Sequence, residues 1–511
     1  MALNMSTMRA APADGQIPPD PGPATPTPRI AALCLVVLTA IALLLRMLHL
    51  TSRSFTLDEG FSLFMARTNS AEFIHTIWNG ELNMALYYAT LRLWLHLSVS
   101  EFATRILSVA FGAATVAVVY FLGIRLFGRR VAIVAALIMA LHPAHVSLSQ
   151  DARSYSLTLL LVSLSSLLLL RTLQQPSLFN WSGYAIVTAL AVYSHFFAVL
   201  VIIAQVFALL FPAVDNRKWN FLLKAVLLLA VLLTPIAIFL ARTPRLGLTW
   251  VPALSSRRIF DLLYFLTLSK CRCLTYLVLW AAAIWAVISR RHDRAVAWPY
   301  WFVLSWLFVP VALTIAASVL RPLLVERFLA ICIPASVLLA AAGFDYLLEH
   351  LRWVGAVTLL LLVLYSARSV RFLYRHPDIN DDWRGATAYV LANARPNDEV
   401  VVLPSYARFT VDYYYDIAGA RAPNVRMTSV VPVESASRLP ETVWFLSSNF
   451  PKPGFGESQV EAFLKTHDAY CADPPGYFTR VKVWRALRCR PDSIAAPPAR
   501  LNPGLSSPAG K

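Results

Sequence analysis

The chain has 511 residues, of which 58% are apolar and only 14% are charged, and its mean hydropathy is +0.59. A water-soluble domain does not need so much apolar surface to fill a core, so the excess is expected to face lipid. The formal net charge is +17, and most of it precedes Arg371. Basic cytoplasmic loops and affinity for anionic lipid explain this charge without a nucleic-acid partner.

The N-terminal segment 1–28 is rich in Pro, Ala and Thr and poor in large apolar groups. Such a segment cannot offset its ordering entropy, so it is predicted to be disordered. The apolar run that follows is long, has no small-residue cleavage site after it and precedes many further apolar runs. It is therefore predicted to be a retained first membrane helix and not a signal peptide.

Dense apolar blocks of about span length alternate with short basic turns throughout 29–370. Placing the basic turns in the cytoplasm predicts about eleven transmembrane helices with the N-terminus inside. The stretch 182–213 fits either one long helix or two short ones. The predicted spans are 30–50, 104–124, 131–147, 156–171, 182–195, 196–213, 221–241, 274–289, 298–318, 327–345 and 354–370.

Two regions are then predicted to lie outside the membrane. Segment 51–101 mixes apolar and charged residues at helical spacing, which suits helices lying on the membrane face. Segment 371–490 alternates helical and strand patterns, which predicts a small extracytoplasmic α/β domain with a partly parallel sheet, followed by a disordered tail, 491–511. Within this domain Cys471 and Cys489 flank a strand-turn-strand segment and are expected to pair in an oxidising compartment.

In this topology, many ionisable side chains fall at the outer helix ends or in the outer loops. Polar groups near hydrocarbon are costly unless they are paired or solvated, so this cluster indicates a pocket for a polar or charged ligand. The alternative is that helix ends are commonly polar. The residues concerned are Asp58, Glu59, Arg105, His142, His145, Asp151, Arg153, His195, Arg242, Arg245, Glu326 and Arg327.

The acidic pair Asp58–Glu59 follows the first span. A carboxylate at this position could deprotonate an incoming hydroxyl or amine, which is a poor nucleophile without a base. The same pair could instead cap a helix or form an ion pair. The residues alone leave both interpretations open.

Further candidates are Arg153, His195 and Arg327. The planar charge of Arg153 suits a phosphate at the membrane edge, although this side chain could also reach toward lipid headgroups or pair with Asp151. His195 lies among aromatic residues and fits either a packing histidine or a contact to sugar. Arg327 follows Glu326, with which an ion pair is as plausible as ligand binding.

No cofactor is predicted, and a divalent metal is possible but not indicated by the residues. The pair His142 and His145 is interrupted by Pro143 and has no carboxylate at ligand spacing. No glycine-rich loop of the kind that cradles nucleotide phosphates occurs, so neither a nucleotide sugar nor ATP is expected as a substrate.

Several segments occur in an order that resembles the bacterial glycosyltransferases of the C-type fold. The relatives include protein O-mannosyltransferases, lipid A aminoarabinose transferases and galacturonosyltransferases of lipopolysaccharide cores. The resemblance covers about 29–403. It is carried by LDEGFSLF, NMALYYATLRLWLHL, EFATRILSVAFGAATVAVVYFLGIRLFGRR, SQDARSYSLTLLL, YSHFF, ERFLAICIPASVLLAAAGF and DDWRGATAYV.

The resemblance implies an inverting enzyme of the plasma membrane that moves a sugar from a polyprenyl monophosphate to an extracytoplasmic acceptor. It implies that Asp58 stands where the family has its catalytic or acceptor-binding acidic residue, with Glu59 beside it, and that cationic groups stabilise the leaving phosphate. We predict that Asp58 is the base. Many members carry His-Pro-Pro-Leu where this chain has Asn83–Leu86, so the acceptor is not predicted. The implied donor phosphate contacts are Arg153, Tyr155 and Arg327, and the candidate acceptor or sugar contacts are His195 and Tyr87.

The competing hypothesis is a transporter or flippase of lipid-linked saccharides. Transporters commonly show internal repeats and ionisable groups near the middle of their helices. Here no repeat is evident and the polar groups gather at one end. A non-catalytic member with a binding or assembly role also stays open.

Overall fold

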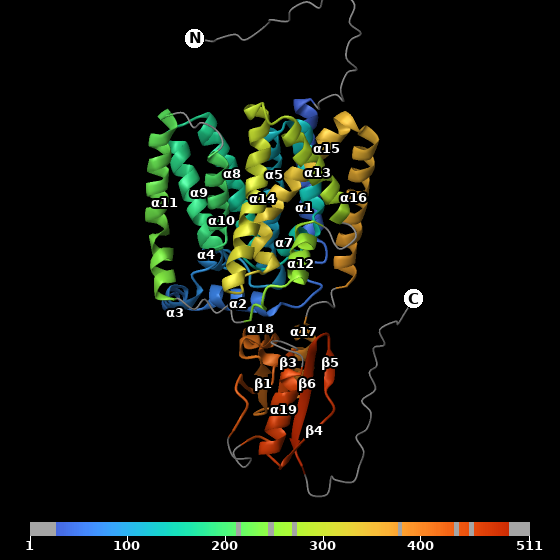
Figure 1. The fold of residues 1–511 in the computed structure, drawn as a ribbon. Coiled ribbons are helices and arrows are strands. Elements are labelled where there is room, and N and C mark those ends of the chain that lie inside the picture. Colours follow the sequence, from blue (N-terminus) through green and yellow to red (C-terminus); the bar gives the residue numbers. More distant parts are fainter. Residues whose placement is uncertain are drawn as a thin grey trace, which may run out of the picture.

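The computed structural model describes residues 27–210, 216–243, 250–267, 273–376, 381–433, 439–448 and 454–489. The chain forms a helical bundle, and a small α/β domain lies against one end of it (Figure 1). The two tails predicted to be disordered lie outside the described residues, except for Thr27 and Pro28. Arg245 of the predicted outer cluster lies outside them too.

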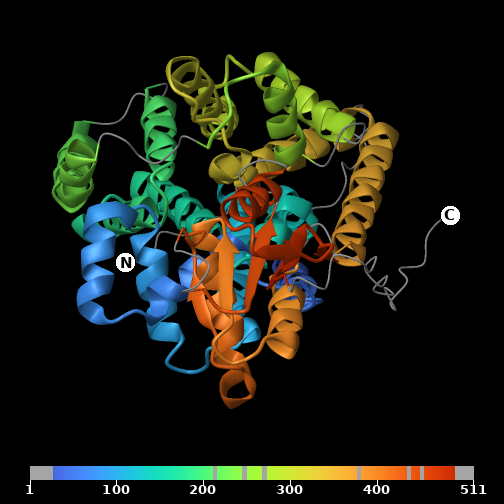
Figure 2. The same cartoon turned by 90° about the horizontal axis from the view of Figure 1, so that it is seen from below.

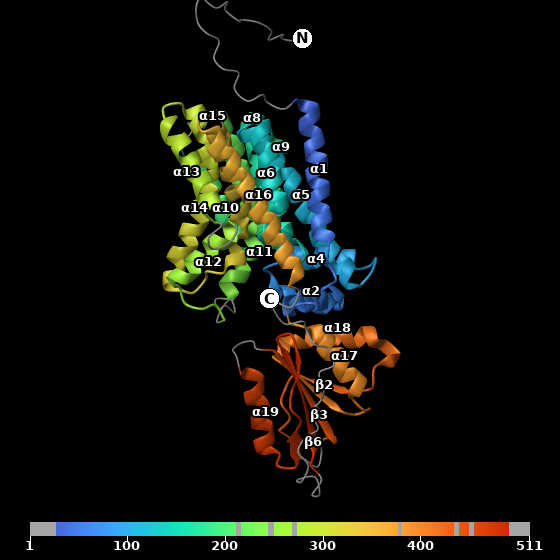
Figure 3. The ribbon, with the colours of Figure 1, turned by 90° about the vertical axis from the view of Figure 1, so that its right-hand side faces the viewer.

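The bundle contains long helices that run between its two ends, and shorter ones gather at the end that meets the α/β domain (Figures 1 and 3). The long elements and their neighbours are α1 (Pro28–Met47), α5 (Glu101–Leu126), α6 (Arg129–Leu141), α7 (Pro143–Ser149), α8 (Tyr155–Gln174), α9 (Leu178–Ser194), α10 (Ala198–Leu209), α11 (Asn216–Arg242), α13 (Cys273–Ser289), α14 (Arg294–Leu320), α15 (Ile333–His350) and α16 (Arg352–Arg375). The shorter ones are α2 (Leu57–Arg67), α3 (Ser70–Thr76), the π-helix η1 (Ile77–Glu81), α4 (Ala85–Trp94), α12 (Ser256–Leu266) and the 3₁₀-helix η3 (Glu326–Cys332).

Helices occur at all eleven predicted spans, but the count of eleven crossings is not confirmed. Among the described residues, seven helices are long and apolar enough to cross a membrane, or eight if the bent pair α6 and α7 is one span. The bend of 60° falls at Pro143, which cannot donate a backbone hydrogen bond to α6. The stretch 182–213 forms two helices, because His195 is extended and separates α9 from α10.

The bundle interior is packed around α15, whose small side chains let neighbouring helices come close. Gly343 shows how close: a Cβ placed there would lie 1.8 Å from the carbonyl oxygen of Leu279 in α13. Close packing of this kind is a main source of helix association in a membrane, where burial of apolar surface adds little.

Segment 51–101, which is predicted to lie outside the membrane, folds into α2, α3, η1 and α4, and these helices lie across one end of the bundle (Figures 1 and 2). Helix α2 begins at a capping box in which Thr56 and Glu59 bond to one another's backbone amides. This box sets the start of the helix that carries Asp58.

The C-terminal domain has the predicted alternation of helices and strands. Its elements are α17 (Trp383–Asn393), β1 (Glu399–Leu403), η5 (Ser405–Ala407), α18 (Arg408–Ala418), η6 (Gly419–Arg421), β2 (Arg426–Thr428), β3 (Thr442–Ser448), α19 (Phe455–Thr466), β4 (Tyr470–Ala472), β5 (Gly476–Phe478) and β6 (Val481–Arg488). The sheet order is β2-β1-β3-β6-β4, with β5 beside β6; β1 pairs in parallel with β2 and β3, and β6 is antiparallel to its neighbours. Cys471 and Cys489 form the predicted disulfide.

The two parts are joined tightly where α18 lies on α2. A Cβ on Gly60 would lie 2.1 Å from the Oγ1 of Thr410 and 2.9 Å from its Cα, so the two backbones are almost in contact. The Tyr414 hydroxyl accepts from the amide of Phe55 and donates to Glu101. The C-terminal domain is therefore seated directly on the helix that carries Asp58.

We expect Gly60→Ala to loosen this joint. Overpacking a tight contact costs about 1–3 kcal/mol, and here the obstacle includes backbone atoms that cannot rotate away. A lower midpoint of thermal unfolding and faster proteolysis between the two parts would support this expectation. Gly183→Ala is the matched control, since a Cβ on Gly183 meets nothing within 4 Å. Equal stability of the two variants would contradict it.

Candidate active site

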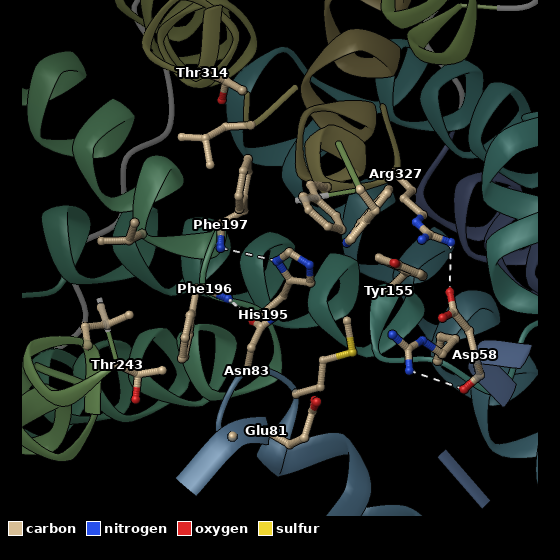
Figure 4. A pocket seen from close by; sticks show the side chains of 18 of the residues that line it. Asp58, Glu81, Asn83, Tyr155, His195, Phe196, Phe197, Thr243, Thr314 and Arg327 are labelled. Carbon is tan, nitrogen blue, oxygen red and sulfur yellow. Dashed lines mark hydrogen bonds and ion pairs between the residues drawn. The ribbon is translucent and has the colours of Figure 1, made fainter. Parts of the chain in front are cut away.

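A cavity of about 1180 Å³ lies where the bundle meets the C-terminal domain. One wall is apolar and comes from α11 and α14, which are candidate membrane spans, and from the shorter apolar helix α10, with Leu200, Phe239 and Leu313 among its residues. The other end is polar and holds Asp58 and Arg327, as Figure 4 shows. The cavity thus joins an apolar wall at membrane depth to charged groups at the mouth of the bundle.

Asp58 lies between two arginines that come from different parts of the chain. Its Oδ2 is 2.9 Å from Nη1 of Arg327, and its backbone carbonyl accepts from Nη1 of Arg153 at 3.3 Å (Figure 4). Burial acts to raise the pKa of Asp58, but the charges of Arg153 and Arg327 and the hydrogen bond from Arg327 outweigh it and lower this pKa below its ordinary value of 3.8. The carboxylate is thus ionised at neutral pH.

Three hydrogen-bonding groups of the cavity lining have no partner among the described residues. They are Nε of Arg153, the hydroxyl of Tyr155 and Nε2 of His195. Nδ1 of His195 accepts from the amide of Phe197, so Nε2 carries the hydrogen and is a donor. Buried donors without partners are costly, and this set fits an anionic or hydroxyl-bearing ligand.

Glu59 does not line the cavity, although it adjoins Asp58 in sequence. Its oxygens accept from Nε and Nη2 of Arg105 at 2.7 and 2.9 Å, and both side chains are fully buried. Oε1 also accepts from the amide of Ala152, and Oε2 from the amide of Thr56. Burial acts to raise the pKa of Glu59, but Arg105 outweighs it and lowers this pKa to about 2. The acidic pair could have supplied a base, a helix cap or an ion pair. Glu59 serves as the helix cap and the ion-pair partner.

Tyr87, a predicted contact to acceptor or sugar, also lies outside the cavity lining. It is fully buried and its hydroxyl is 3.0 Å from the Oγ of Ser108. The neighbouring Tyr88 lies closer to the site, since its hydroxyl accepts from Nη1 of Arg153 at 3.4 Å. Four of the other predicted residues, Asp58, Arg153, Tyr155 and Arg327, are brought together with His195 in the lining.

The rest of the predicted outer cluster serves other contacts. Asp151 pairs with Arg53, and Glu326 lies 3.5 Å from Arg258. His145 is buried against Arg46 of α1, with Nδ1 and Nη2 2.7 Å apart. Across the described ranges, no group of three or more His, Cys, Asp or Glu side chains is placed to hold a metal.

Several lining residues were missed by sequence reasoning. Glu81, from η1, makes no hydrogen bond or ion pair within the described part of the chain, and burial raises its pKa above 4.5. Its only sequence signal was a charge within the first outer loop. The others lie far along the chain, where only folding brings them near Asp58: Trp250, Asp381, Tyr406 and Arg480.

Comparison with known proteins yields one family and a set of solved structures. Residues 84–241 match the family model described as dolichyl-phosphate-mannose-protein mannosyltransferase. ArnT from Cupriavidus metallidurans in the apo state aligns at a TM-score of 0.55 and 15% identity, over 89% of this chain and 98% of that one. The same protein bound to undecaprenyl phosphate aligns at 0.54 and 15% identity, over 91% and 99%.

A more distant likeness is to the apo oligosaccharyltransferase from Archaeoglobus fulgidus, with a TM-score of 0.51 and 12% identity, over 87% of this chain and 69% of that one. No curated protein sequence matches the chain. The candidate spans together with the shared fold make the chain a multi-pass membrane protein. Residues 84–241 are thus similar to this mannosyltransferase family, and the chain shares the fold of these solved membrane glycosyltransferases.

Proposed function

We propose that this enzyme transfers a sugar from a polyprenyl monophosphate carrier to an acceptor at the extracytoplasmic face of the plasma membrane, with inversion. The observation that carries the proposal is the cavity itself. Its apolar wall, at membrane depth, suits a polyprenyl chain, and its polar end suits the phosphate and the sugar. One of the structural relatives, ArnT, has been solved with undecaprenyl phosphate bound.

The reaction is a single displacement. The acceptor oxygen attacks the anomeric carbon while the bond from that carbon to the carrier phosphate breaks, and the polyprenyl phosphate leaves with the bonding electrons. The acceptor proton passes to Asp58, which is ionised in the free enzyme. Arg153 and Arg327 stabilise the charge that develops on the leaving phosphate.

The ion pair of Asp58 with Arg327 links donor binding to the base. Both side chains are 39% exposed, so the pair is open to exchange when a phosphate enters the cavity. A phosphate that takes the guanidinium of Arg327 leaves Asp58 with one fewer cation, which raises its pKa and makes it a stronger base. The carboxylate is thus activated once the donor is bound.

The orientation of the chain follows from its basic loops. Arg130 pairs with Asp345 and Arg290 with Glu349, and both acidic partners lie near the end of α15. The turn from α15 to α16 lies at the end of the bundle away from the C-terminal domain (Figure 1). We propose that this end is cytoplasmic, in line with the enrichment of cytoplasmic loops in Lys and Arg. The C-terminal domain and Asp58 then face the extracytoplasmic side.

The proposal is tested by transfer of a labelled sugar from polyprenyl phosphate carriers in membranes that contain the wild-type chain as their only source of the activity. Label in an acceptor fraction supports it. Label that crosses the bilayer on its carrier without reaching an acceptor would favour the flippase instead. If no carrier in the panel gave either sugar transfer or movement across the bilayer, both the transferase and the flippase would be refuted.

We expect Arg327→Ala to weaken carrier binding by about ten- to a hundred-fold, because a charge-assisted bond to phosphate is lost. Binding of undecaprenyl phosphate to the purified chain in detergent is measured by isothermal titration calorimetry. Arg67→Ala is the matched control, since Arg67 makes an exposed ion pair with Asp416 and does not line the cavity. Equal affinity of the two variants would exclude Arg327 as a phosphate ligand.

A further inference from the structure

The C-terminal domain forms part of the cavity, on the side opposite to the apolar wall. Tyr406 of η5, Asp381 before α17, and Arg480 in the turn between β5 and β6 all belong to the lining. Nε of Arg480 lies 3.8 Å from Oδ1 of Asp381. Because 57% of the Arg480 side chain is exposed, this side of the cavity is reached from the water phase.

These side chains are held in a fixed relation to the base. The amide of Asp382 donates to the carbonyl of Thr479 at 2.9 Å, which ties the β5–β6 turn to the start of α17. Oγ of Ser54 donates to the carbonyl of Asp381 at 2.6 Å and accepts from the amide of Trp383. Ser54 lies shortly before Asp58 in the chain, so these hydrogen bonds anchor the start of α17 next to the loop that leads into the base.

Tyr406 lies in the electrostatic field of both carboxylates. Burial raises the pKa of the Tyr406 hydroxyl, and the charges of Asp58 and Asp381 raise it further. Burial likewise raises the pKa of Asp381, while Arg480 acts in the opposite direction. Tyr406 therefore shares the cavity lining with both Asp58 and Asp381.

We propose that Tyr406, Asp381 and Arg480 form the acceptor subsite, and that it binds the hydroxyl groups of a saccharide acceptor next to Asp58. The proposal rests on the transferase function proposed above, in which the carrier occupies the apolar wall and Arg327. The acceptor must then arrive from the side that the C-terminal domain forms.

The chemistry of the subsite favours a neutral, polyhydroxylated acceptor. A guanidinium beside a carboxylate offers donors and acceptors at one place, which matches neighbouring sugar hydroxyls that both donate and accept. An anionic acceptor would meet the charge of Asp381 close to Arg480, which opposes its binding. The Tyr406 ring adds an apolar face and a hydroxyl to the same wall.

The test uses the full chain in nanodiscs that hold its lipid-linked donor, with detergent-extracted cell-envelope glycan as the titrated acceptor. We expect Arg480→Ala and Asp381→Ala each to raise the half-saturating amount of this glycan by about tenfold, the loss that one such hydrogen-bonded pair produces. Affinity for undecaprenyl phosphate is expected to stay at the wild-type value. Arg485→Ala is the matched control, because Arg485 pairs with Asp473 on the same sheet and does not line the cavity.

Two outcomes would overturn the acceptor subsite. Either unchanged half-saturation in both variants, or an equal loss of carrier affinity, would remove Asp381 and Arg480 from acceptor binding and with them the proposed subsite. A steep fall of glycan affinity between low and high salt would mean that the acceptor is charged and would refute the neutral saccharide. Failure of the transferase proposal is recognised separately, since the wild-type chain would then transfer no sugar at any glycan concentration.

Discussion

Asp58→Asn is expected to lower the rate of sugar transfer by about a hundred- to ten-thousand-fold, the contribution of a general base. The substitution keeps the shape of the side chain but removes the charge that accepts the proton. It also releases Arg327 from its ion pair, so undecaprenyl phosphate should bind as tightly as to the wild type or more tightly. A general base is identified when the variant stays folded and binds the carrier but no longer transfers sugar.

The pH dependence separates Asp58 from Glu81, the other carboxylate of the lining. The pKa of Asp58 is below 3.8 in the free enzyme, so kcat/KM for the donor should be level from pH 7 down to about pH 4 and fall only below it. The pKa of Glu81 is above 4.5, so a rate that depended on ionised Glu81 would already fall as pH decreases toward 5. If kcat/KM fell already near pH 5 and this fall disappeared in Glu81→Gln, Glu81 would be the general base. Full activity of Asp58→Asn would lead to the same conclusion.

Glu59→Ala is expected to act on stability, although Glu59 adjoins the base. Removing one partner of a buried ion pair leaves an uncompensated charge and costs about 3–5 kcal/mol. Here Arg105 would lose its only carboxylate partner among the described residues, and the amides of Thr56 and Ala152 would each lose an acceptor. We therefore expect a large fall in the thermal unfolding midpoint of the detergent-solubilised protein.

The matched comparison is Asp58→Asn, which lies one residue away and should leave the unfolding midpoint almost unchanged. Combining Glu59→Leu with Arg105→Met should recover part of the loss, since the unpaired charge is gone. The recovery should be incomplete, because the carbonyls of Leu50 and Ser54 lose the donor that Arg105 supplies. A stable but inactive Glu59→Ala would mean that Glu59 takes part in the chemistry and would contradict the structural role.

Much of the fold is local in origin, and for that reason it could be predicted. Apolar blocks of span length form helices wherever they occur, because a backbone in lipid must satisfy its own hydrogen bonds. The stretches EVVVL and TVWFLSS form strands, in line with the predicted alternation of helices and strands, and both are wholly buried. Helix boundaries that depend on a single residue were harder to predict. The break at His195 and the bend at Pro143 affect the number of membrane crossings, and hydropathy alone does not locate them.

The candidate site could be predicted only in part, because a residue type does not say which way its side chain points. Asp58 and Glu59 are neighbours in sequence and differ by about 100° around α2, so one reaches the cavity while the other is buried against Arg105. Tyr87 and Tyr88 diverge for the same reason, one toward Ser108 and the other toward Arg153.

The sequence by itself determined that the chain enters the membrane, that an α/β domain follows the helices, and that acidic and basic groups gather at one end of the spans. These properties depend on composition and on short-range periodicity. Only the tertiary structure decided which of those groups share a cavity. Trp250, Tyr406 and Arg480 reach Asp58 across long stretches of chain, and the close contact of Gly60 with Thr410 seats the C-terminal domain beside it. Such contacts depend on packing between distant elements, which local patterns do not encode.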